Sequence, residues 1–278
     1  MKCLVCSDPI LEPHFKALLR CTNCGFITAN SNLSLQDLQD LYGAGYFSGD
    51  EYWDYLGDKK IIQKNLSRWL KEIKKYSPSG SLVEIGCAYG FFLELARYSF
   101  DAVGYDLCAE AITYANNVPG NKAKHGDFLT DTALGTESVD NVVMWDVIEH
   151  LPNPSEFIKR SSTILKPAGH IFITTGDIDA WLPKKQGPNW RMIHPPTHLQ
   201  YFSSKTLQLL LESHGFEICN ITYPGYWRSI GQILHGLGKF GSRTRKQNYL
   251  TLAGKLIPLH TSVYLNTFDI MFVSARKI

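Results

Sequence analysis

Between Ser81 and Thr175 the 278-residue chain alternates short apolar runs with amphipathic stretches, and this alternation constrains the fold most strongly. The apolar runs lie at 81–85, 101–106, 139–146 and 169–175, and the helical patterns between them lie at 91–99, 109–117 and 155–165. Strands that are separated by helices pair in parallel through right-handed crossovers. The sequence therefore predicts an α/β fold whose ligand site lies at the carboxyl ends of the strands.

The first predicted strand runs into a turn, EIGCAYG at 84–90, whose small residues allow a ligand to approach the backbone closely. The dinucleotide pattern G-x-G-x-x-G would need a glycine at Phe91, so a pyrophosphate site is disfavoured. The carboxylate of Glu84 suits a ligand with an ammonium group. Asp106 ends the second strand, where an acid can accept hydrogen bonds from both ribose hydroxyls. A nucleoside that carries a cationic amino acid, as S-adenosylmethionine does, satisfies both features.

Four segments resemble, in this order, the motifs of class I S-adenosylmethionine-dependent methyltransferases: LVEIGCAYGFFLELA, the strand end at Asp106, HGDF at 125–128, and VVMWDVIEHLPNP. The resemblance implies a Rossmann-like seven-stranded methyltransferase sheet and S-adenosyl-L-methionine as the cofactor. The cofactor-binding residues that it implies are Glu84, Gly86, Cys87, Ala88 and Gly90 at the methionine end, Asp106 and Leu107 at the ribose, Asp127 and Phe128 at the adenine, and Asp146 and Val147 near the sulfonium. Ala88 stands where the family usually has glycine.

Four cysteines near the amino terminus, Cys3, Cys6, Cys21 and Cys24, form two C-x2-C pairs that are separated by fourteen residues. Two such knuckles offer four thiolates on tight turns, which is the ligand set of a tetrahedral Zn²⁺ site. Four protein ligands leave no open coordination position, so the predicted zinc is structural. The alternative is a set of unrelated buried or redox-active cysteines.

The predicted domain order is a zinc ribbon or knuckle at 1–30, a connector at 31–79, and a methyltransferase domain at 80–278 with a helical insertion at about 226–262. In the connector one helix is expected after Ser34, and apolar residues repeat at helical spacing from Ile61 to Ile73. The aromatic residues between these two helices predict either a lid over the ligand site or simple core packing.

Histidines follow two of the predicted strands. His150 follows the fourth strand, and His194 and His198 follow the fifth in the loop HPPTHLQYF. A hydroxyl or a carbon acid needs a base for methyl transfer, and histidine titrates near neutral pH. We expect His198 first, and His150 second, to act as this base; fixing the loop is the alternative role of both. The other candidate bases are Asp146, Glu149 and Asp177. A His194–His198 metal pair is disfavoured, because the two intervening prolines prevent a regular helix.

A narrower resemblance concerns the double knuckle, the aromatic YF…YWDY segment and the run W-x4-PP-x-H-L-x-Y-F-S at 190–203. These are similar to a bacterial subgroup that modifies sugars or small metabolites, whose best-known members are deoxysugar C-methyltransferases with a zinc module. The chain is shorter than those enzymes and leaves no room for their additional carboxyl-terminal domain. We expect methyl transfer to a sugar, a nucleotide-sugar or a related metabolite. The alternatives are an RNA methyltransferase whose zinc module binds nucleic acid, and a non-catalytic cofactor-binding partner subunit.

The distribution of charged residues along the sequence indicates which kinds of binding partner to expect. The net charge of +2, and the absence of an N/D-P-P-Y/F tetrapeptide after the fourth strand, argue against nucleic acid. No Asp or Glu occurs between Ile218 and Phe268, where the basic residues are Arg228, Lys239, Arg243, Arg245, Lys246 and Lys255. This tract predicts an anionic acceptor or a peripheral membrane contact, with a solvated surface as the alternative. The polar start MKCLVCSDP predicts a cytoplasmic protein with reduced cysteines. The oligomeric state is not indicated.

Overall fold

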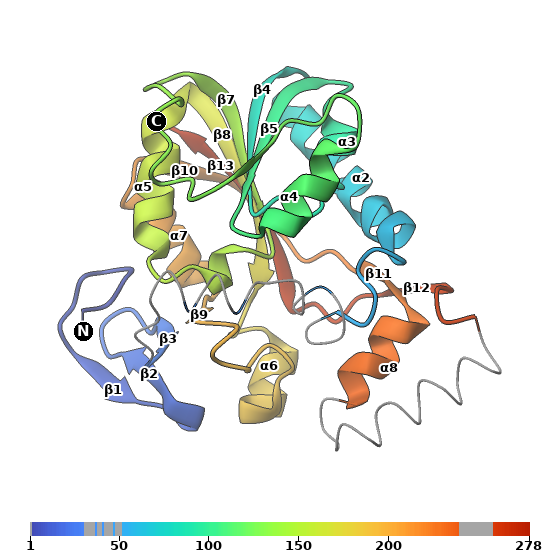
Figure 1. Cartoon of the computed structure of the whole chain (residues 1–278). Helices are drawn as coiled ribbons and strands as arrows, with labels where there is room; N and C mark the ends of the chain where they lie inside the picture. Colours follow the sequence, from blue (N-terminus) through green and yellow to red (C-terminus); the bar gives the residue numbers. More distant parts are fainter. Residues whose placement is uncertain (1, 31–36, 38–40, 42–46, 48–51, 239–257) are drawn as a thin grey trace.

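The structure is a computed structural model that describes residues 2–30, 37, 41, 47, 52–238 and 258–278 (Figure 1). Its central sheet has seven strands in the order β10-β13-β8-β7-β4-β5-β6, which confirms the predicted fold class. The strands are β4 (Gly80–Ile85), β5 (Phe100–Asp106), β6 (Ala123–His125), β7 (Val139–Trp145), β8 (Leu165–Gly176), β10 (Phe216–Thr222) and β13 (Ile270–Lys277). Neighbouring strands from β8 to β6 pair in parallel, whereas β13 runs antiparallel to both β8 and β10.

Helices cover both faces of this sheet (Figure 1). One face carries α2 (Lys59–Tyr76), α3 (Leu93–Ala96) and α4 (Ala109–Asn116), and the other carries α5 (Pro154–Ile164) and α7 (Ser204–Glu212). Because successive strand residues point to opposite faces, Leu82 packs on the first side and Val83 on the second. Helix α2 confirms the periodicity between Ile61 and Ile73, whereas α3 covers only part of the predicted 91–99.

The amino-terminal segment shares a sheet with a loop of the domain that follows it. Strands β1 (Leu11–Pro13), β2 (Leu18–Cys21) and β3 (Ile27–Ala29) continue into β9 (Gln200–Tyr201), which belongs to the loop HPPTHLQYF. The amide of Ala29 donates to the carbonyl of Leu199 at 2.7 Å, and the rings of Phe26 and Phe202 lie 5.1 Å apart. The cysteine-bearing segment therefore packs as part of the domain.

The insertion before the last strand is only partly helical. It contains β11 (Tyr226–Ser229), α8 (Ile230–Gly238) and β12 (Ser262–Leu265), and its two strands form a separate antiparallel sheet that was not predicted. The amide of Asn65 on α2 donates to the carbonyl of Trp227 at 2.8 Å, and Asn65 accepts from the Trp227 amide at 2.8 Å. These two hydrogen bonds fasten the insertion to the connector.

Short elements complete the chain: the 3-10 turns η1 (Phe15–Ala17), η3 (Ile148–His150) and η4 (Gly187–Asn189), and helix α6 (Trp181–Gln186). Several predictions fall outside the described residues, namely the helix after Ser34, Tyr46 in the aromatic segment, and the basic residues Lys239, Arg243, Arg245, Lys246 and Lys255. Within the described part of the chain, every helix is too short or too polar to cross a bilayer.

Candidate active site

Two adjoining cavities open at the carboxyl ends of the parallel strands. The large cavity has a volume of about 560 Å³, and the small cavity has a volume of about 400 Å³. Both are lined by the same six residues where they meet: Tyr52, Tyr55, Gly86, Trp145, Asp146 and His150. Glu84 and Cys87 face the large cavity, and Ala88, Asp106, Leu107, Asp127, Phe128 and Val147 face the small one. The implied cofactor residues are thus brought together, with Gly90 as the exception.

Glu84 brings an unpaired carboxylate oxygen to the large cavity from the end of β4. The residue is only 3% exposed, and its Oε2 has no hydrogen-bond partner in the described part of the chain. Burial, together with the nearby charge of Asp106, raises the pKa of this carboxyl well above its ordinary value. A buried carboxylate without a partner is costly, and an ammonium group bound here would supply the partner.

The turn after β4 has the left-handed backbone that lets a ligand approach. Gly86 has φ +74°, and a Cβ at this position would lie 2.5 Å from Cγ2 of Val147. Ala88 also has positive φ, +44°, which costs a residue with a side chain about 1–2 kcal/mol. Its amide donates to Oδ2 of Asp106 at 2.8 Å, so the strained turn holds the acidic side chain in place.

Gly90 has a packing role in the turn after β4, and it lines neither cavity. Its φ is +71°, and a Cβ added there would lie 2.8 Å from the Cβ of Ala115 on α4. Glycine is needed here because the turn packs closely against a helix.

The carboxylate of Asp106 can accept more hydrogen bonds than the protein donates to it. One carboxylate oxygen accepts from the amide of Ala88 at 2.8 Å and the other from the amide of Cys108 at 2.9 Å. Burial raises the pKa of Asp106, although these amides act in the opposite direction. Each carboxylate oxygen keeps a further lone pair that can accept a ribose hydroxyl.

Two of the three predicted histidines meet a buried carboxylate beside the large cavity. The side chains of Glu149, His150 and His198 bring their donor atoms within 4.8 Å of one another, and the imidazole centroids of His150 and His198 lie 4.6 Å apart. Nδ1 of His150 lies 2.8 Å from the carbonyl oxygen of Thr197. A carbonyl only accepts, so Nδ1 carries the hydrogen and Nε2 carries the lone pair. His150 lines both cavities, whereas His198 lines only the large one.

Glu149 was expected only as an alternative base. It is 2% exposed, and its Oε2 accepts from the hydroxyl of Thr175 at 2.8 Å. Burial, with a smaller contribution from Asp146, raises the pKa of Glu149 to about 8. Asp177, another alternative, lines neither cavity; it accepts instead from the hydroxyl of Tyr223 at 2.5 Å.

A pH dependence of stability follows from Glu149. Its pKa rises from 4.5 to about 8 on folding, so between these values the folded chain holds a proton that the unfolded chain has released. The free energy of unfolding therefore falls as the pH rises from 5 to 8. Glu149→Gln is expected to flatten this decline, measured by urea unfolding across the range. The exposed Glu212→Gln serves as control and follows the wild type; equal slopes for wild type and Glu149→Gln would contradict the expectation.

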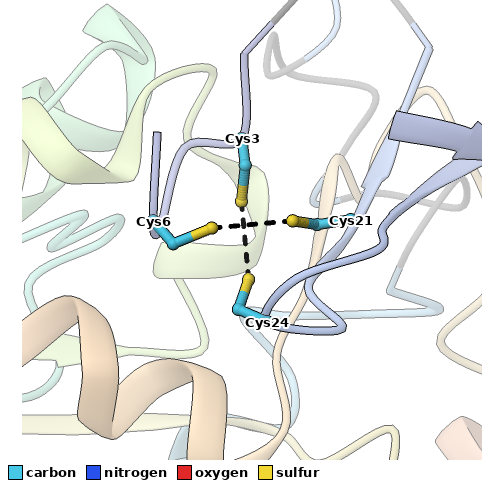
Figure 2. Close-up of side chains that lie close together, drawn as sticks. All are labelled: Cys3, Cys6, Cys21 and Cys24. Carbon is cyan, nitrogen blue, oxygen red and sulfur yellow. Dashed lines mark hydrogen bonds between the residues drawn. The ribbon is translucent and has the colours of Figure 1, made fainter. Parts of the chain in front are cut away.

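The four amino-terminal cysteines point their sulfurs at a common centre (Figure 2). The sulfurs of Cys3 and Cys24 lie 3.6 Å apart, as do those of Cys6 and Cys21. A tetrahedral zinc site with Zn–S bonds of about 2.3 Å has sulfur–sulfur edges of about 3.8 Å, whereas a disulfide needs about 2.05 Å. The geometry therefore fits a metal ion and not a pair of disulfides.

Several cavity residues could not be recognised from the sequence. Tyr52 and Tyr55 belong to the aromatic segment that was expected to be a lid or core, and they line both cavities. Arg191, Tyr226 and Arg228 line the large cavity. Arg228 stood out only as one member of a basic tract, since nothing in the sequence placed it against the strand ends.

Comparison with known proteins agrees with this geometry. The family described as "Methyltransferase domain" matches residues 58–221. A ubiquinone biosynthesis O-methyltransferase of Cupriavidus pinatubonensis is 30% identical over 100 residues, covering 34% of this chain and 40% of the relative. The same enzyme of Photobacterium profundum is 26% identical over 133 residues, covering 45% and 57%. The chain thus spans about half the length of these curated relatives.

A solved structure shows the same fold. An S-adenosylmethionine-dependent methyltransferase from Archaeoglobus fulgidus superposes with a TM-score of 0.54 at 18% identity, covering 79% of this chain and 94% of that one. At this identity the likeness concerns the fold alone. The family match, however, extends over more than half of the chain, from the start of α2 through most of β10. This confirms the predicted enzyme class at the level of the family: the chain belongs to the methyltransferase domain family.

Proposed function

We propose that this chain transfers a methyl group from S-adenosylmethionine to a small molecule bound in the large cavity. The observation that carries the proposal is the meeting of two cavities at Gly86, Asp146 and His150. Methyl transfer needs donor and acceptor to be held in line and shielded from water. Two adjoining sites that share one wall satisfy this requirement.

The donor fits the small cavity and its junction with the large one. Asp106 offers acceptor lone pairs to the ribose hydroxyls of the donor. Phe128 provides an apolar wall, beside Asp127, for the adenine ring. Glu84 lies at the other end, where the ammonium group would complete its hydrogen bonding. The donor supplies an electrophilic methyl on a sulfonium, and the bond to sulfur breaks as the bond to the acceptor forms.

His150 is the base in this proposal. Its tautomer places a lone pair on Nε2, which takes the proton of an acceptor hydroxyl as the methyl group arrives. His198 packs edge-to-face on this ring and keeps it in position. This assignment reverses the order expected from the sequence, because only His150 lines both cavities.

The size of the large cavity and the names of the relatives support the proposed acceptor class. A cavity of about 560 Å³ lies within the range of about 300–1,000 Å³ that is typical of small-molecule sites. A sugar, a nucleotide-sugar or a related hydroxyl-bearing metabolite fits this volume, and the curated relatives carry the name O-methyltransferase. We further propose that Cys3, Cys6, Cys21 and Cys24 hold a structural Zn²⁺.

Replacement of His150 tests the mechanism. His150→Asn is expected to lower methyl transfer by roughly 100-fold or more, while the affinity for S-adenosylhomocysteine changes little. Transfer of a radiolabelled methyl group to a panel of sugars, nucleotide-sugars and phenols provides the rate, and calorimetry provides the affinity. His214→Asn is the control, because His214 lines neither cavity and its ring is hydrogen-bonded to Ser155. Binding without turnover on any acceptor would count against catalysis and favour a cofactor-binding subunit.

A further inference from the structure

Arg228 stands in the wall of the large cavity without a counterion. It lies on β11, and because side chains alternate along a strand it faces the same side as Tyr226. The Tyr226 hydroxyl lies 3.5 Å from Oδ1 of Asp146, one of the residues that the two cavities share. The Arg228 guanidinium lies 5.5 Å from the centre of the Tyr226 ring. Its charge is therefore held close to the place where the methyl group would be transferred.

The other charges nearby do not neutralise Arg228. In the described part of the chain no carboxylate lies within 4.0 Å of its guanidinium, and no hydrogen bond reaches it. Arg191, on the same cavity wall, is already paired with Asp269, which is fully buried and also accepts from the Trp190 indole at 2.7 Å. Burial, and then the charge of Arg191, lower the pKa of Arg228. Among the described residues, Arg228 is thus a guanidinium in the cavity wall that has no paired carboxylate.

Asp146 does not act as the missing counterion. Its Oδ1 accepts from the hydroxyl of Thr174 at 2.9 Å. Burial raises the pKa of Asp146, although the charges of Arg228 and Arg191 act in the opposite direction. An unpaired cation in a partly desolvated cavity is unfavourable, and an incoming anion relieves this cost. The planar fork of arginine matches the two oxygens of a carboxylate or a phosphate.

We propose that Arg228, with Arg191 beside it, binds a carboxylate or phosphate group of the methyl acceptor. The inference rests on the proposed methyl transfer and narrows its substrates to anionic ones, such as an acidic sugar or a sugar phosphate. The neutral sugars that fit the cavity by volume are then poor acceptors, because they leave Arg228 without a partner.

The test measures binding of two simple anions, inorganic pyrophosphate and malonate, to the full chain loaded with S-adenosylhomocysteine. Titration calorimetry compares wild type with Arg228→Met, Arg228→Lys and the control Arg97→Met, whose guanidinium pairs with Tyr98 away from both cavities. We expect at least one anion to bind the wild type, to bind Arg228→Met at least tenfold more weakly, and to bind Arg228→Lys with intermediate affinity. Arg97→Met is expected to match the wild type.

The affinity for S-adenosylhomocysteine separates the possible outcomes. If Arg228→Met binds S-adenosylhomocysteine as tightly as the wild type does, the variant is folded. The difference in anion affinity between the two proteins then decides whether Arg228 binds the anion. A tenfold loss of this affinity would assign Arg228 to the cofactor's own carboxylate and overturn the inference. Equal anion affinity in wild type and Arg228→Met, or no anion binding to the wild type, would overturn it as well. Failure of the wild type to bind S-adenosylhomocysteine would instead overturn the proposed function, and the inference with it.

Discussion

Replacement of Gly86 by alanine is expected to weaken the binding of S-adenosylhomocysteine by roughly 10- to 100-fold. The new methyl group would lie 2.5 Å from Cγ2 of Val147 and 3.1 Å from its Cγ1. Neither atom can remain in place, so either the turn or the Val147 side chain must shift. Both line the small cavity, where the adenosine is proposed to bind. Titration calorimetry with S-adenosylhomocysteine measures the loss.

A matched control separates this clash from the cost of the backbone conformation. Gly215 has φ +80°, close to the +74° of Gly86, but the nearest atom to an added Cβ is Oγ of Ser162 at 4.0 Å. Gly215→Ala is expected to cost about 1–2 kcal/mol of stability through its left-handed backbone, with unchanged cofactor affinity. If Gly86→Ala bound the cofactor as well as Gly215→Ala does, the small cavity would not be the donor site.

Removal of one of the four proposed zinc ligands is expected to have the largest effect on stability. Cys24→Ser leaves an incomplete site, and a short module that depends on its metal loses its fold with the metal. The melting temperature is expected to fall by about 10 °C or more, which corresponds to roughly 3 kcal/mol for a chain of this size. Because β3 pairs with β9, the loop that carries His198 loses its neighbour as well. Methyl transfer should therefore fall along with stability.

Zinc content and thermal unfolding provide the measurement. The wild type is expected to retain about one zinc ion per chain through gel filtration, and Cys24→Ser to retain none. Cys219→Ser is the control, because this exposed thiol on β10 lies away from the cluster and its replacement leaves both quantities unchanged. A wild type without zinc, as stable as its Cys24→Ser variant, would show that the four thiols serve another purpose.

The alternation of apolar runs and helical patterns predicted β4, β5, β7 and β8 of the central sheet, whereas its seven strands were implied by the family resemblance. Long elements repeat their pattern several times, and α2 buries Ile61, Leu66, Trp69 and Ile73 at the spacing that a helix requires. Strand β9 has two residues and is too short to show the alternating hydrophobic pattern of a strand, so its pairing with β3 could not be predicted. The strands β11 and β12 escaped prediction because their pairing joins Tyr226 to Leu265 across a long stretch of chain.

The donor side of the candidate site was accessible to sequence reasoning, and the acceptor side was not. Glu84, Asp106 and Asp146 stand at or next to strand ends, where the topology of a parallel sheet brings them together. The position of Arg228 depends on how the insertion folds back over the sheet, and no local sequence pattern predicts that. The proposed choice of His150 over His198 depends on which of the two lines both cavities and on the carbonyl of Thr197, and neither can be read from the sequence.

The two cavities also differ in which part of the chain builds them. Among the described residues, those that line the small cavity lie between Phe47 and Phe157, whereas the large cavity adds residues from Leu182 to Ile270. The insertion leaves the sheet near Tyr223 and returns near Asn266, and the Asn266 amide closes its base by donating to the Tyr223 carbonyl at 3.0 Å. The two ends of the insertion therefore lie next to each other, at Tyr223 and Asn266. If this insertion is replaced by that of a relative, the chimera is expected to methylate a different acceptor. Its proposed donor site is expected to remain that of the present chain.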